Sequence, residues 1–291
     1  MKIYYYVHTG HRIGLDRFRR ASAIIKALKG IDITLLTSDY RIASVAREYG
    51  IEKSVGIDVV RNIANIAQQG DKLIFDSPEA NPIMLEDMRN YFSTFIRISD
   101  EPNDTKVSNE FLISPYVKGD GICHSLAIDE EYFQNFKKDI NISYFFGDDD
   151  YEKDLEKHFD FINGLDLYLQ LGFYYFFDYE DMLKEKFPNH FEFDDYKEMI
   201  QRTDILISAS PQAVLESLAS GGRPIYFQRE DYPQDFIPLF ETLHIPIIKN
   251  YDKELLHKTI KLIKNNSYDN YKRVDNNCYK IANFIKKHLN L

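Results

Sequence analysis

The sequence predicts an α/β protein with two domains, each built on a parallel sheet. Short apolar runs alternate with segments that carry apolar residues at helical spacing, from residue 2 to about residue 250, which is typical of consecutive βαβ units. The cycle starts at residues 2–7 and starts again at residues 142–146. The length of 291 residues also favours two domains, because a single core rarely serves more than about 250–300 residues.

The first predicted domain covers residues 1–135. The pattern predicts strands at residues 2–7, 31–36, 73–75, 94–98 and 111–113, and helices at residues 15–29, 40–49, 58–68 and 81–91. A lysine-bearing, weakly apolar segment follows at residues 131–141, and we place the domain boundary there. The first strand, its glycine-bearing loop and the first helix open a βαβ unit.

The second predicted domain covers residues 136–291. Strands are expected at residues 142–146, 165–169, 191–193, 205–207 and 224–227, and helices at residues 151–163, 179–187, 195–202 and 212–220, with a mostly helical tail at residues 253–291. Two such strand-led domains describe two Rossmann-like folds that face each other across a cleft. Ligands of open α/β sheets bind at the carboxyl edge of the strands.

The unit at residues 203–227 gives the clearest prediction of a binding site. Residues 205–207 form an apolar run typical of a buried parallel strand, and a turn leads from there into a helix that ends at Gly221 and Gly222. Such a turn lies at the carboxyl edge, where a helix N-terminus offers backbone N–H groups to an anion. Glu216 follows inside this helix, near enough to the turn for its carboxylate to reach a ligand's hydroxyl groups.

The composition excludes several classes of function. The formal net charge of −10 argues against a nucleic-acid partner, since phosphate binding needs a basic face; a local pocket can still bind a small anion. No stretch approaches 18 apolar residues and no signal-peptide pattern is present, so we predict no membrane span and a cytoplasmic protein. Cys123 and Cys278 match no metal-ligand spacing and are expected to be free thiols.

One acidic run invites a metal-binding interpretation. Residues 146–150 read Phe-Gly-Asp-Asp-Asp, and clustered carboxylates can hold Mg²⁺. Adjacent acids mostly point in different directions, and capping of the following helix by Asp148 or Asp149 explains them without a metal. The sequence also lacks a Walker loop and a zinc signature. We therefore predict neither a metal nor a bound cofactor.

The run from Asp204 to Glu216, followed by Gly222-Arg-Pro-Ile, resembles the donor signature in the second domain of two-domain GT-B nucleotide-sugar enzymes. Those enzymes usually read as an apolar strand, Ser-Ala-Gly-Gly-Ser-Thr, two residues, Glu, and then Gly-x-Pro. The resemblance implies that Glu216 holds the ribose hydroxyls of a nucleotide. It also implies that the turn wraps the phosphates, with the candidate residues Ser208, Ser210 and Gln212. The alternative is an ordinary βαβ unit with a solvated glutamate.

Other features extend this resemblance or depart from it. Ser210 and Pro211 stand where the family commonly has two glycines, and a proline has no N–H to give to a phosphate. Gln234 and Asp235 occupy the place of the loop that touches the donor sugar. The resemblance also implies that the helical tail packs back on the first domain.

The order of elements is similar to one narrower group, the UDP-sugar hydrolase of the pseudaminic-acid pathway and its relatives. That group has Ile-Gly-x-Gly-His-x-x-Arg at the start of the first helix, where this chain has Ile13-Gly-Leu-Asp-Arg-Phe-Arg-Arg20. Asp16 and Arg17 therefore occupy the Gly and His positions, while Gly14 is retained and is by resemblance a candidate substrate-binding residue. The chain also resembles short motifs of this group at residues 73–77, 98–101 and 145–150.

The resemblance assigns candidate roles in the first domain. The family histidine is the base that activates water or orients the scissile phosphate; Arg17 cannot be a general base, but it can clamp a diphosphate. Proton transfer then falls to Asp16, His11 or His8, if a pKa is brought near neutrality. The alternatives are a helix N-terminal acid for Asp16, a solvated loop histidine for His11, and a surface or inter-domain ion pair for Arg17.

The resemblance as a whole implies a nucleotide-sugar-processing enzyme of bacterial surface-glycan or sugar-modification biosynthesis, which cleaves a UDP-linked sugar. A glycosyltransferase is the second interpretation, because the loss of the histidine removes the best water-activating group. A non-catalytic nucleotide-sugar-binding protein is the third. Release of nucleotide without an acceptor, only with an acceptor, or not at all distinguishes the three.

Overall fold

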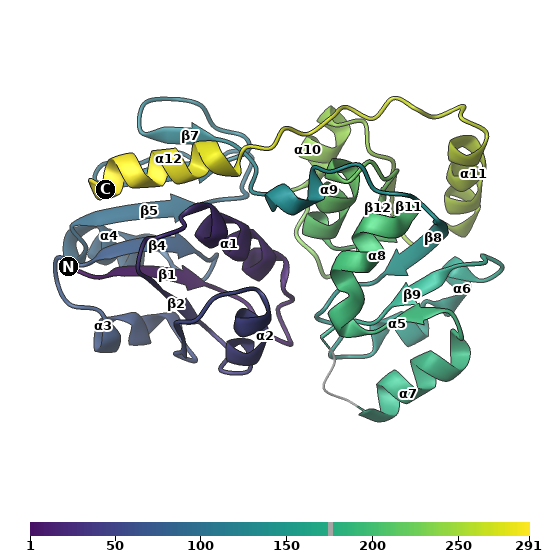
Figure 1. The fold of residues 1–291 in the computed structure, drawn as a ribbon, viewed down its shortest axis with the longest axis horizontal. Helices are drawn as coiled ribbons and strands as arrows, with labels where there is room; N and C mark the ends of the chain where they lie inside the picture. Colours follow the sequence, from purple (N-terminus) through teal and green to yellow (C-terminus); the bar gives the residue numbers. More distant parts are fainter. Residues whose placement is uncertain (174–176) are drawn as a thin grey trace. The chain divides into compact units, whose positions relative to one another are not determined.

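A computed structural model describes residues 1–173 and 177–291 of the chain (Figure 1). It divides into two compact units, the first formed by Met1–Glu130 together with Asn276–Leu291, and the second by Glu131–Asp275. A short 3-10 turn, η2 (Glu130–Tyr132), lies where the chain passes from one unit to the other. Each unit is described by itself below.

The first unit is organised around a seven-stranded sheet in the order β3-β2-β1-β4-β5-β6-β7. Every neighbouring pair is parallel. The strands are β1 (Ile3–Val7), β2 (Ile33–Thr37), β3 (Ser54–Gly56), β4 (Lys72–Asp76), β5 (Thr94–Ile98), β6 (Phe111–Ser114) and β7 (Ile122–His124). Because β2 and β4 lie on opposite sides of β1, the direction of winding reverses between β1 and β4, and this switch point is where such sheets bind ligands.

Helices cover both faces of the first sheet (Figure 1). Alternate residues of β1 point to opposite faces, so that Tyr4 and Tyr6 join a core cluster with Ile63 and Met88 from two of these helices. The helices of this unit are α1 (Asp16–Ala27), α2 (Ile42–Glu48), η1 (Val60–Asn62), α3 (Ile63–Ile66), α4 (Pro82–Tyr91) and α12 (Cys278–Leu289). The last of these packs against α1, β5 and β7, which places the end of the chain in the first unit.

The second unit is organised around a six-stranded parallel sheet in the order β10-β9-β8-β11-β12-β13. The strands are β8 (Ile140–Phe145), β9 (Tyr168–Gln170), β10 (His190–Phe191), β11 (Thr203–Ser208), β12 (Ile225–Phe227) and β13 (Ile247–Ile248). Its switch point lies between β8 and β11. The register Ser208↔Phe145 brings the carboxyl ends of these two strands together.

Helices again form a layer on each face of this sheet. The helices are α5 (Asp154–Lys157), α6 (Phe159–Ile162), α7 (Phe177–Lys186), η3 (Phe193–Asp195), α8 (Tyr196–Arg202), α9 (Pro211–Ala219), α10 (Ile237–Thr242) and α11 (Lys253–Lys264). Tyr144 and Phe146 pack with residues of α5, α6, α7 and α11, whereas Phe145, one position out of phase, contacts Tyr196 of α8. Over the described residues, no helix is both long and apolar enough to cross a membrane.

The predicted fold class, α/β with two Rossmann-like parallel sheets, is confirmed. The predicted helix at 151–163 is instead two short helices, interrupted at His158. This residue has a non-helical backbone, and its ring stacks on Tyr251 with centroids 3.6 Å apart, so a tertiary contact outweighs the local helical pattern. The predicted helix at 58–68 is likewise shorter, since Asp58 has a left-handed φ of 59° and Ala67 is extended.

Among the elements that the structure describes, three strands and one α-helix were not expected from the sequence. The strands β3, β7 and β13 have only two or three residues each, too few for an alternating pattern to be recognised. Helix α10 has six residues. The tail predicted as mostly helical consists of α11 and α12 with an irregular segment between them.

Candidate functional site

The predicted binding turn lies at the switch point of the second sheet. It connects β11 to α9, and the amide of Ala209 donates a 3.3 Å hydrogen bond to the carbonyl of Phe145, the last residue of β8. Ser208 and Ser210 are buried in this turn. The structure therefore brings the ends of the two central strands together at the N-terminus of α9, as the βαβ pattern predicts.

The serines of this turn bond to the turn's own backbone. Ser208 Oγ accepts a 3.0 Å hydrogen bond from the amide of Ser210, and Ser210 Oγ accepts a 3.1 Å bond from the amide of Ala213 as the N-cap of α9. Pro211 at the first helical position has no N–H. This turn consequently offers fewer amide donors to a phosphate than a glycine-rich turn would.

Glu216 lies inside the protein, with 2% of its surface exposed. The hydroxyl of Tyr196 donates to its Oε2 at 2.7 Å, and Nε2 of Gln212, one helical turn earlier, donates to its Oε1 at 2.9 Å. Both carboxylate oxygens therefore have a protein donor, which fixes the orientation of the carboxylate. The glutamate is not solvated, contrary to the alternative for an ordinary βαβ unit.

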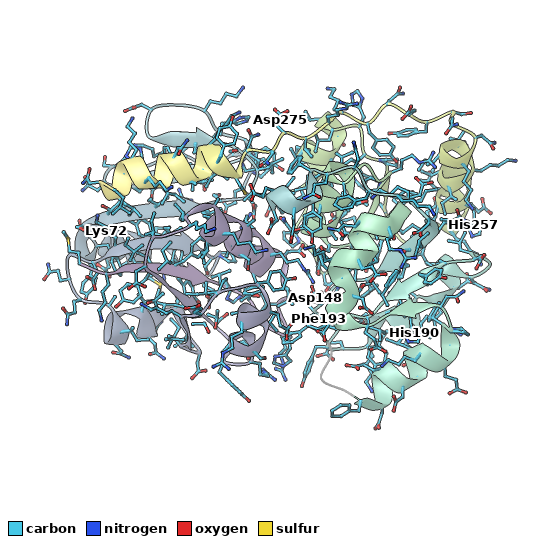
Figure 2. All side chains as sticks on the ribbon, in the orientation of Figure 1. Lys72, Asp148, His190, Phe193, His257 and Asp275 are labelled. Atoms are coloured by element: carbon cyan, nitrogen blue, oxygen red, sulfur yellow. The ribbon has the colours of Figure 1, made fainter. Side chains whose placement is uncertain are left out.

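The three aspartates after β8 have separate structural partners. Asp148 accepts a 3.2 Å hydrogen bond from the amide of Phe173. The ring of Phe173 also packs against Phe193. Figure 2 labels Asp148 and Phe193. Asp150 accepts from the amide of Asp154 at 2.6 Å, at the start of α5. Capping of this helix thus comes from Asp150 and not from Asp148 or Asp149. Over the part of the chain that the structure describes, no group of three or more His, Cys, Asp or Glu side chains could hold a metal ion.

Asp149 belongs to a buried ion-pair network. Arg229 Nη1 lies 2.9 Å from its Oδ1, and the hydroxyl of Tyr232 donates to the same oxygen at 2.6 Å. The guanidinium also lies over the rings of Phe146 and Tyr232, 4.4 and 4.3 Å from their centroids. Burial raises the pKa of Asp149 and the charge of Arg229 offsets only part of that rise. The network joins the loops that follow β8 and β12.

The two remaining candidates of the second unit lie in the loop before α10. Gln234 is exposed and Asp235 is partly buried. The carbonyl of Gln234 accepts a 3.1 Å hydrogen bond from the amide of Ile237, so this residue shapes the turn into the helix. Both follow β12, the strand beside β11.

In the first unit, the loop after β1 folds on itself. Gly10 and Gly14 form an isolated bridge, and the hydroxyl of Thr9 donates to the carbonyl of Gly14 at 2.8 Å. Gly14 has a φ of 87°, a left-handed value that other residues adopt only with strain. The resemblance assigned Gly14 to substrate binding; its backbone shows a reason for glycine that is independent of any ligand.

His11 is held by a carboxylate. Its Nδ1 lies 2.9 Å from Asp39 Oδ2, while Arg41 Nε donates to Asp39 Oδ1 at 2.8 Å. Burial alone would raise the pKa of Asp39, but the hydrogen bonds from Arg41 and His11 outweigh it and lower the pKa to about 2. His11 is therefore a partly buried, oriented imidazole and not a solvated loop histidine.

The first turn of α1 places Asp16 and Arg17 differently. Asp16 is 31% exposed and forms an ion pair with Arg19 one turn later, at 3.7 Å, which favours its interpretation as a helix N-terminal acid. Arg17 is 26% exposed, and its Nε lies 3.9 Å from Oδ1 of Asp76, the last residue of β4. Arg17 thus pairs with a buried carboxylate of its own unit, whereas the alternative interpretation was a surface or inter-domain ion pair.

Asp76 is bound more closely by a second arginine of the same helix. Arg20 donates through Nε to Asp76 Oδ2 at 3.0 Å and also pairs with Asp100, which follows β5. Burial raises the pKa of Asp76, and Arg20 reverses only part of that rise. For Asp100, the charges of Arg20 and Arg17 outweigh burial and lower the pKa. Two positive charges and two carboxylates therefore meet beside the switch point of the first sheet.

A further histidine lies at this switch point. His8 follows β1, and its Nδ1 lies 2.8 Å from Oε2 of Glu79. Glu79 also accepts from the hydroxyls of Tyr6 and, at 3.0 Å, Ser77. Burial would raise the pKa of Glu79, but the contacts from His8 and Tyr6 lower it. The structure thus supplies each loop histidine with a carboxylate partner.

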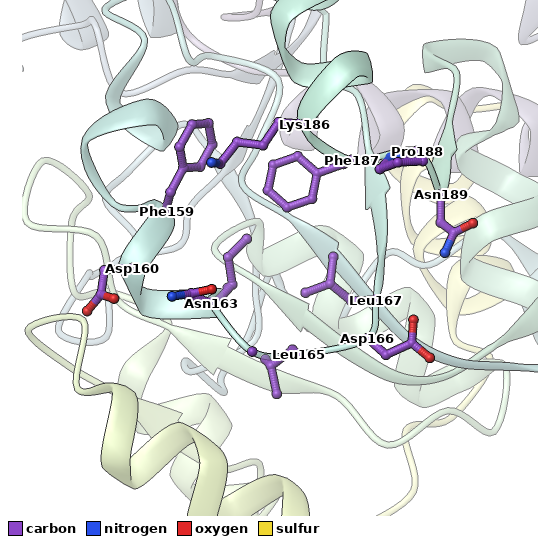
Figure 3. A pocket seen from close by; sticks show the side chains of 12 residues that line it. Phe159, Asp160, Asn163, Leu165, Asp166, Leu167, Lys186, Phe187, Pro188 and Asn189 are labelled. Carbon is purple, nitrogen blue, oxygen red and sulfur yellow. The ribbon is translucent and has the colours of Figure 1, made fainter.

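A separate pocket of about 550 Å³ lies in the second unit (Figure 3). It is at the amino-terminal ends of the strands, opposite the carboxyl ends where the turn before α9 lies. Its walls come from α6 and from the segments that precede β9 and β10. Phe159 and Phe187 meet there with ring centroids 5.5 Å apart, and Lys186 Nζ lies 4.5 Å from the centroid of Phe159. The predicted site residues do not line this pocket.

The partners of the candidate residues were not predicted as site residues. Asp39, Tyr196 and Arg229 come from elements that are distant in sequence from the residues they hold. Asp39, Glu79 and Arg229 had a positional signal, because each closely follows a predicted strand and therefore lies at the carboxyl edge; Tyr196, inside a predicted helix, had none. His11, Asp16, Arg17 and Gly14 belong to the first unit, and the six remaining candidates belong to the second.

The two parallel Rossmann-like sheets, each with a switch point between its central strands, give the chain the GT-B fold. It is similar to Acinetobacter baumannii MurG, at 12% identity and a TM-score of 0.59, with 99% of this chain and 100% of that chain covered. It is also similar to S. aureus MnaA in a structure with UDP, at 12% identity, a TM-score of 0.62 and coverage of 100% and 98%.

A third similar structure is Methanocaldococcus jannaschii UDP-GlcNAc 2-epimerase in complex with UDP-GlcNAc and UDP. It is 12% identical, with a TM-score of 0.62 and coverage of 99% of this chain and 100% of that chain. No protein-family profile and no curated protein sequence matches the chain. At these identities, the similarity establishes the fold.

Proposed function

We propose that the chain is a nucleotide-sugar-processing enzyme whose second unit binds the nucleotide. Glu216 is the observation that carries this proposal. Its carboxylate is buried in the middle of α9 and is held by Tyr196 and Gln212. A group that is already oriented loses less freedom on binding, and a carboxylate accepts hydrogen bonds from the hydroxyls of a ribose.

Two similar structures support UDP as the nucleotide. S. aureus MnaA and M. jannaschii UDP-GlcNAc 2-epimerase were both determined with UDP, the latter also with UDP-GlcNAc. In the reaction we propose, an oxygen nucleophile forms a bond to the anomeric carbon of the sugar. The bond from that carbon to the diphosphate breaks, and UDP leaves with the electron pair. The proton of the nucleophile passes to a base in the first unit.

The first unit offers two imidazoles for this proton transfer: His11, oriented by a hydrogen bond to Asp39, and His8, whose Nδ1 lies 2.8 Å from Glu79 Oε2 without hydrogen-bond geometry. At His11 the carboxylate bonded to Nδ1 orients the ring, and at both residues the nearby carboxylate stabilises the imidazolium that forms. Arg17 supplies positive charge for the diphosphate that leaves. Water as the nucleophile makes the enzyme a hydrolase.

Transfer to an acceptor hydroxyl is the second candidate. An arginine at position 17, paired with Asp76, stands where the hydrolases that the sequence resembles have their histidine, and it cannot activate water. A hydroxyl-bearing acceptor could instead be positioned next to His8 or His11. The bond changes are the same, except that the sugar passes to the acceptor.

A nucleotide-release assay tests the proposal. The protein is incubated with UDP-, CMP- and GDP-linked sugars, with and without hydroxyl acceptors, and free nucleotide is measured. Release without an acceptor identifies a hydrolase, and release that requires an acceptor identifies a transferase. If the protein neither binds nor releases any of these nucleotides, the proposed function is contradicted. Binding without release would identify a binding protein.

A further inference from the structure

An apolar groove runs along one face of the first unit. It lies between the segment η1–α3 and helix α4, and its volume is about 420 Å³, within the range of about 300–1,000 Å³ that small-molecule sites occupy. Its lining is mostly aliphatic and aromatic and includes Val60, Ile63, Ala64, Met84, Met88 and Tyr91. The size and the lining suit an apolar small-molecule group.

The groove begins at the carboxyl edge of the first sheet. Asn81, which caps α4 by accepting a 2.9 Å hydrogen bond from the amide of Met84, is part of its lining. Glu79, the partner of His8, lies two residues before Asn81. From there the groove follows the ten residues of α4, a length of about 15 Å. The His8–Glu79 pair and this end of the groove therefore lie at the same edge of the sheet.

The chemistry of the groove favours an uncharged and flexible occupant. Arg61 and Asp87, which contribute one charge of each sign, are its charged lining residues. Ile83, on the exposed side of α4, is 72% exposed. The two methionines have adaptable side chains that fit irregular apolar groups. An apolar groove whose two charged lining residues have opposite signs suits an alkyl chain.

We propose that this groove binds the alkyl chain of a hydroxyl-bearing acceptor, whose polar end lies at the His8–Glu79 pair. This inference rests on the proposed function and extends it, because it favours transfer over hydrolysis and gives the acceptor's chemical class. The acceptor hydroxyl would form the new bond to the sugar and lose its proton to the first unit.

Binding of short alkyl glucosides tests the groove without any nucleotide. Octyl and hexyl β-D-glucoside are titrated below their critical micelle concentrations into the full chain, with detection by calorimetry. Each buried methylene contributes about a fourfold gain in affinity, so the octyl compound should bind about fifteenfold more tightly than the hexyl compound. Equal affinity of the two, or no saturable binding of either, would overturn the proposal.

Two variants of helix α3 localise the binding. Ala64 lines the groove, whereas the exposed Asn65 beside it does not. Ala64→Trp fills the groove and should abolish the dependence on chain length, while Asn65→Trp adds the same bulk outside it and should leave the binding unchanged. Thermal unfolding checks both folds; if Ala64→Trp does not fold, Met84→Gln, which makes the lining polar, replaces it. Unchanged binding by a folded groove variant would refute the assignment.

Further measurements separate this inference from the proposed function. If octyl glucoside binds as expected but the protein neither binds nor cleaves nucleotide sugars, the groove stands and the proposed function fails. If UDP-sugars are cleaved but alkyl compounds do not bind, only the groove assignment fails. A concentration-dependent dimer that Ala64→Trp dissociates would show that a second copy occupies the groove, and would also overturn the proposal.

Discussion

The hydroxyl of Tyr196 donates a hydrogen bond to Oε2 of Glu216 across 2.7 Å, and both residues are buried. Tyr196 lies in the first turn of α8 and Glu216 in the middle of α9. The bond therefore ties the orientation of the carboxylate to the neighbouring helix. In the proposed function, it makes Tyr196 a positioning residue for the recognition of ribose.

Tyr196→Phe should weaken UDP binding about tenfold, because a hydrogen bond to a charged group contributes about 1.5–3 kcal/mol. The ratio of the affinities for UDP and 2′-deoxy-UDP should also decrease, since the carboxylate would be less well oriented toward the ribose hydroxyls. Calorimetry measures both affinities. The control is Tyr271→Phe, which removes a 3.1 Å hydrogen bond to the carbonyl of Pro224 in the same unit. An unchanged ratio in Tyr196→Phe would show that the tyrosine has only a structural role.

The two imidazoles of the first unit can be distinguished by kinetics. If one of them is the base, its substitution by glutamine should lower turnover about 10²–10⁴-fold, with little change in UDP affinity. His8→Gln and His11→Gln are compared at saturating UDP-sugar, and the one with unchanged turnover is the control for the other. Turnover that survives in both variants would remove the histidines from the mechanism.

Arg17 should act through its planar guanidinium. If it binds the diphosphate, Arg17→Lys should weaken UDP binding, because an ammonium keeps the charge but loses the two-pronged geometry. If the arginine replaced a water-activating histidine, Arg17→His should increase hydrolysis without an acceptor. Arg12→Lys, an exposed arginine of the preceding loop, is the control. If both substitutions of Arg17 leave affinity and turnover unchanged, the residue lies outside the site.

The carboxylate of Asp39 should make stability dependent on pH in the acid range. Its pKa is lowered to about 2 from an ordinary 3.8 by the bonds from Arg41 and His11, against burial. A depressed pKa stabilises the fold above the ordinary pKa, and this contribution, about 2 kcal/mol, is lost as the pH falls through the folded pKa. Urea unfolding of the parent and Asp39→Asn should therefore differ at pH 7 and converge toward pH 2. A constant difference over that range would contradict this account.

The sequence predicts the fold well where elements are long and strongly patterned. The run at 205–207, the turn and the helix are present as β11 and α9, because a buried strand and a capped helix each have a local signal. The same holds for β5, predicted at 94–98 and found at Thr94–Ile98. By contrast, the break at His158 depends on its stacking with Tyr251, a contact between residues 93 positions apart that no local pattern contains.

The candidate site is only partly predictable for the same reason. Pattern and resemblance place Glu216 and Ser210 at the carboxyl edge, since the order of strand, turn and helix determines that position. They do not indicate that Tyr196 holds the glutamate, or that Asp150 caps α5. These partners depend on how the helices pack. Side chains that orient a functional group from another element were therefore the ones missed.

The most direct test of the account is a calorimetric titration of UDP into the parent protein, Glu216→Gln and Glu241→Gln. Glu241 is an exposed glutamate of α10, and its substitution is the matched control. The account predicts that UDP binds the parent and the control equally, and that Glu216→Gln binds about ten- to a hundredfold more weakly while unfolding at the same temperature. Equal binding of UDP by a folded Glu216→Gln would show that the nucleotide site is not at α9.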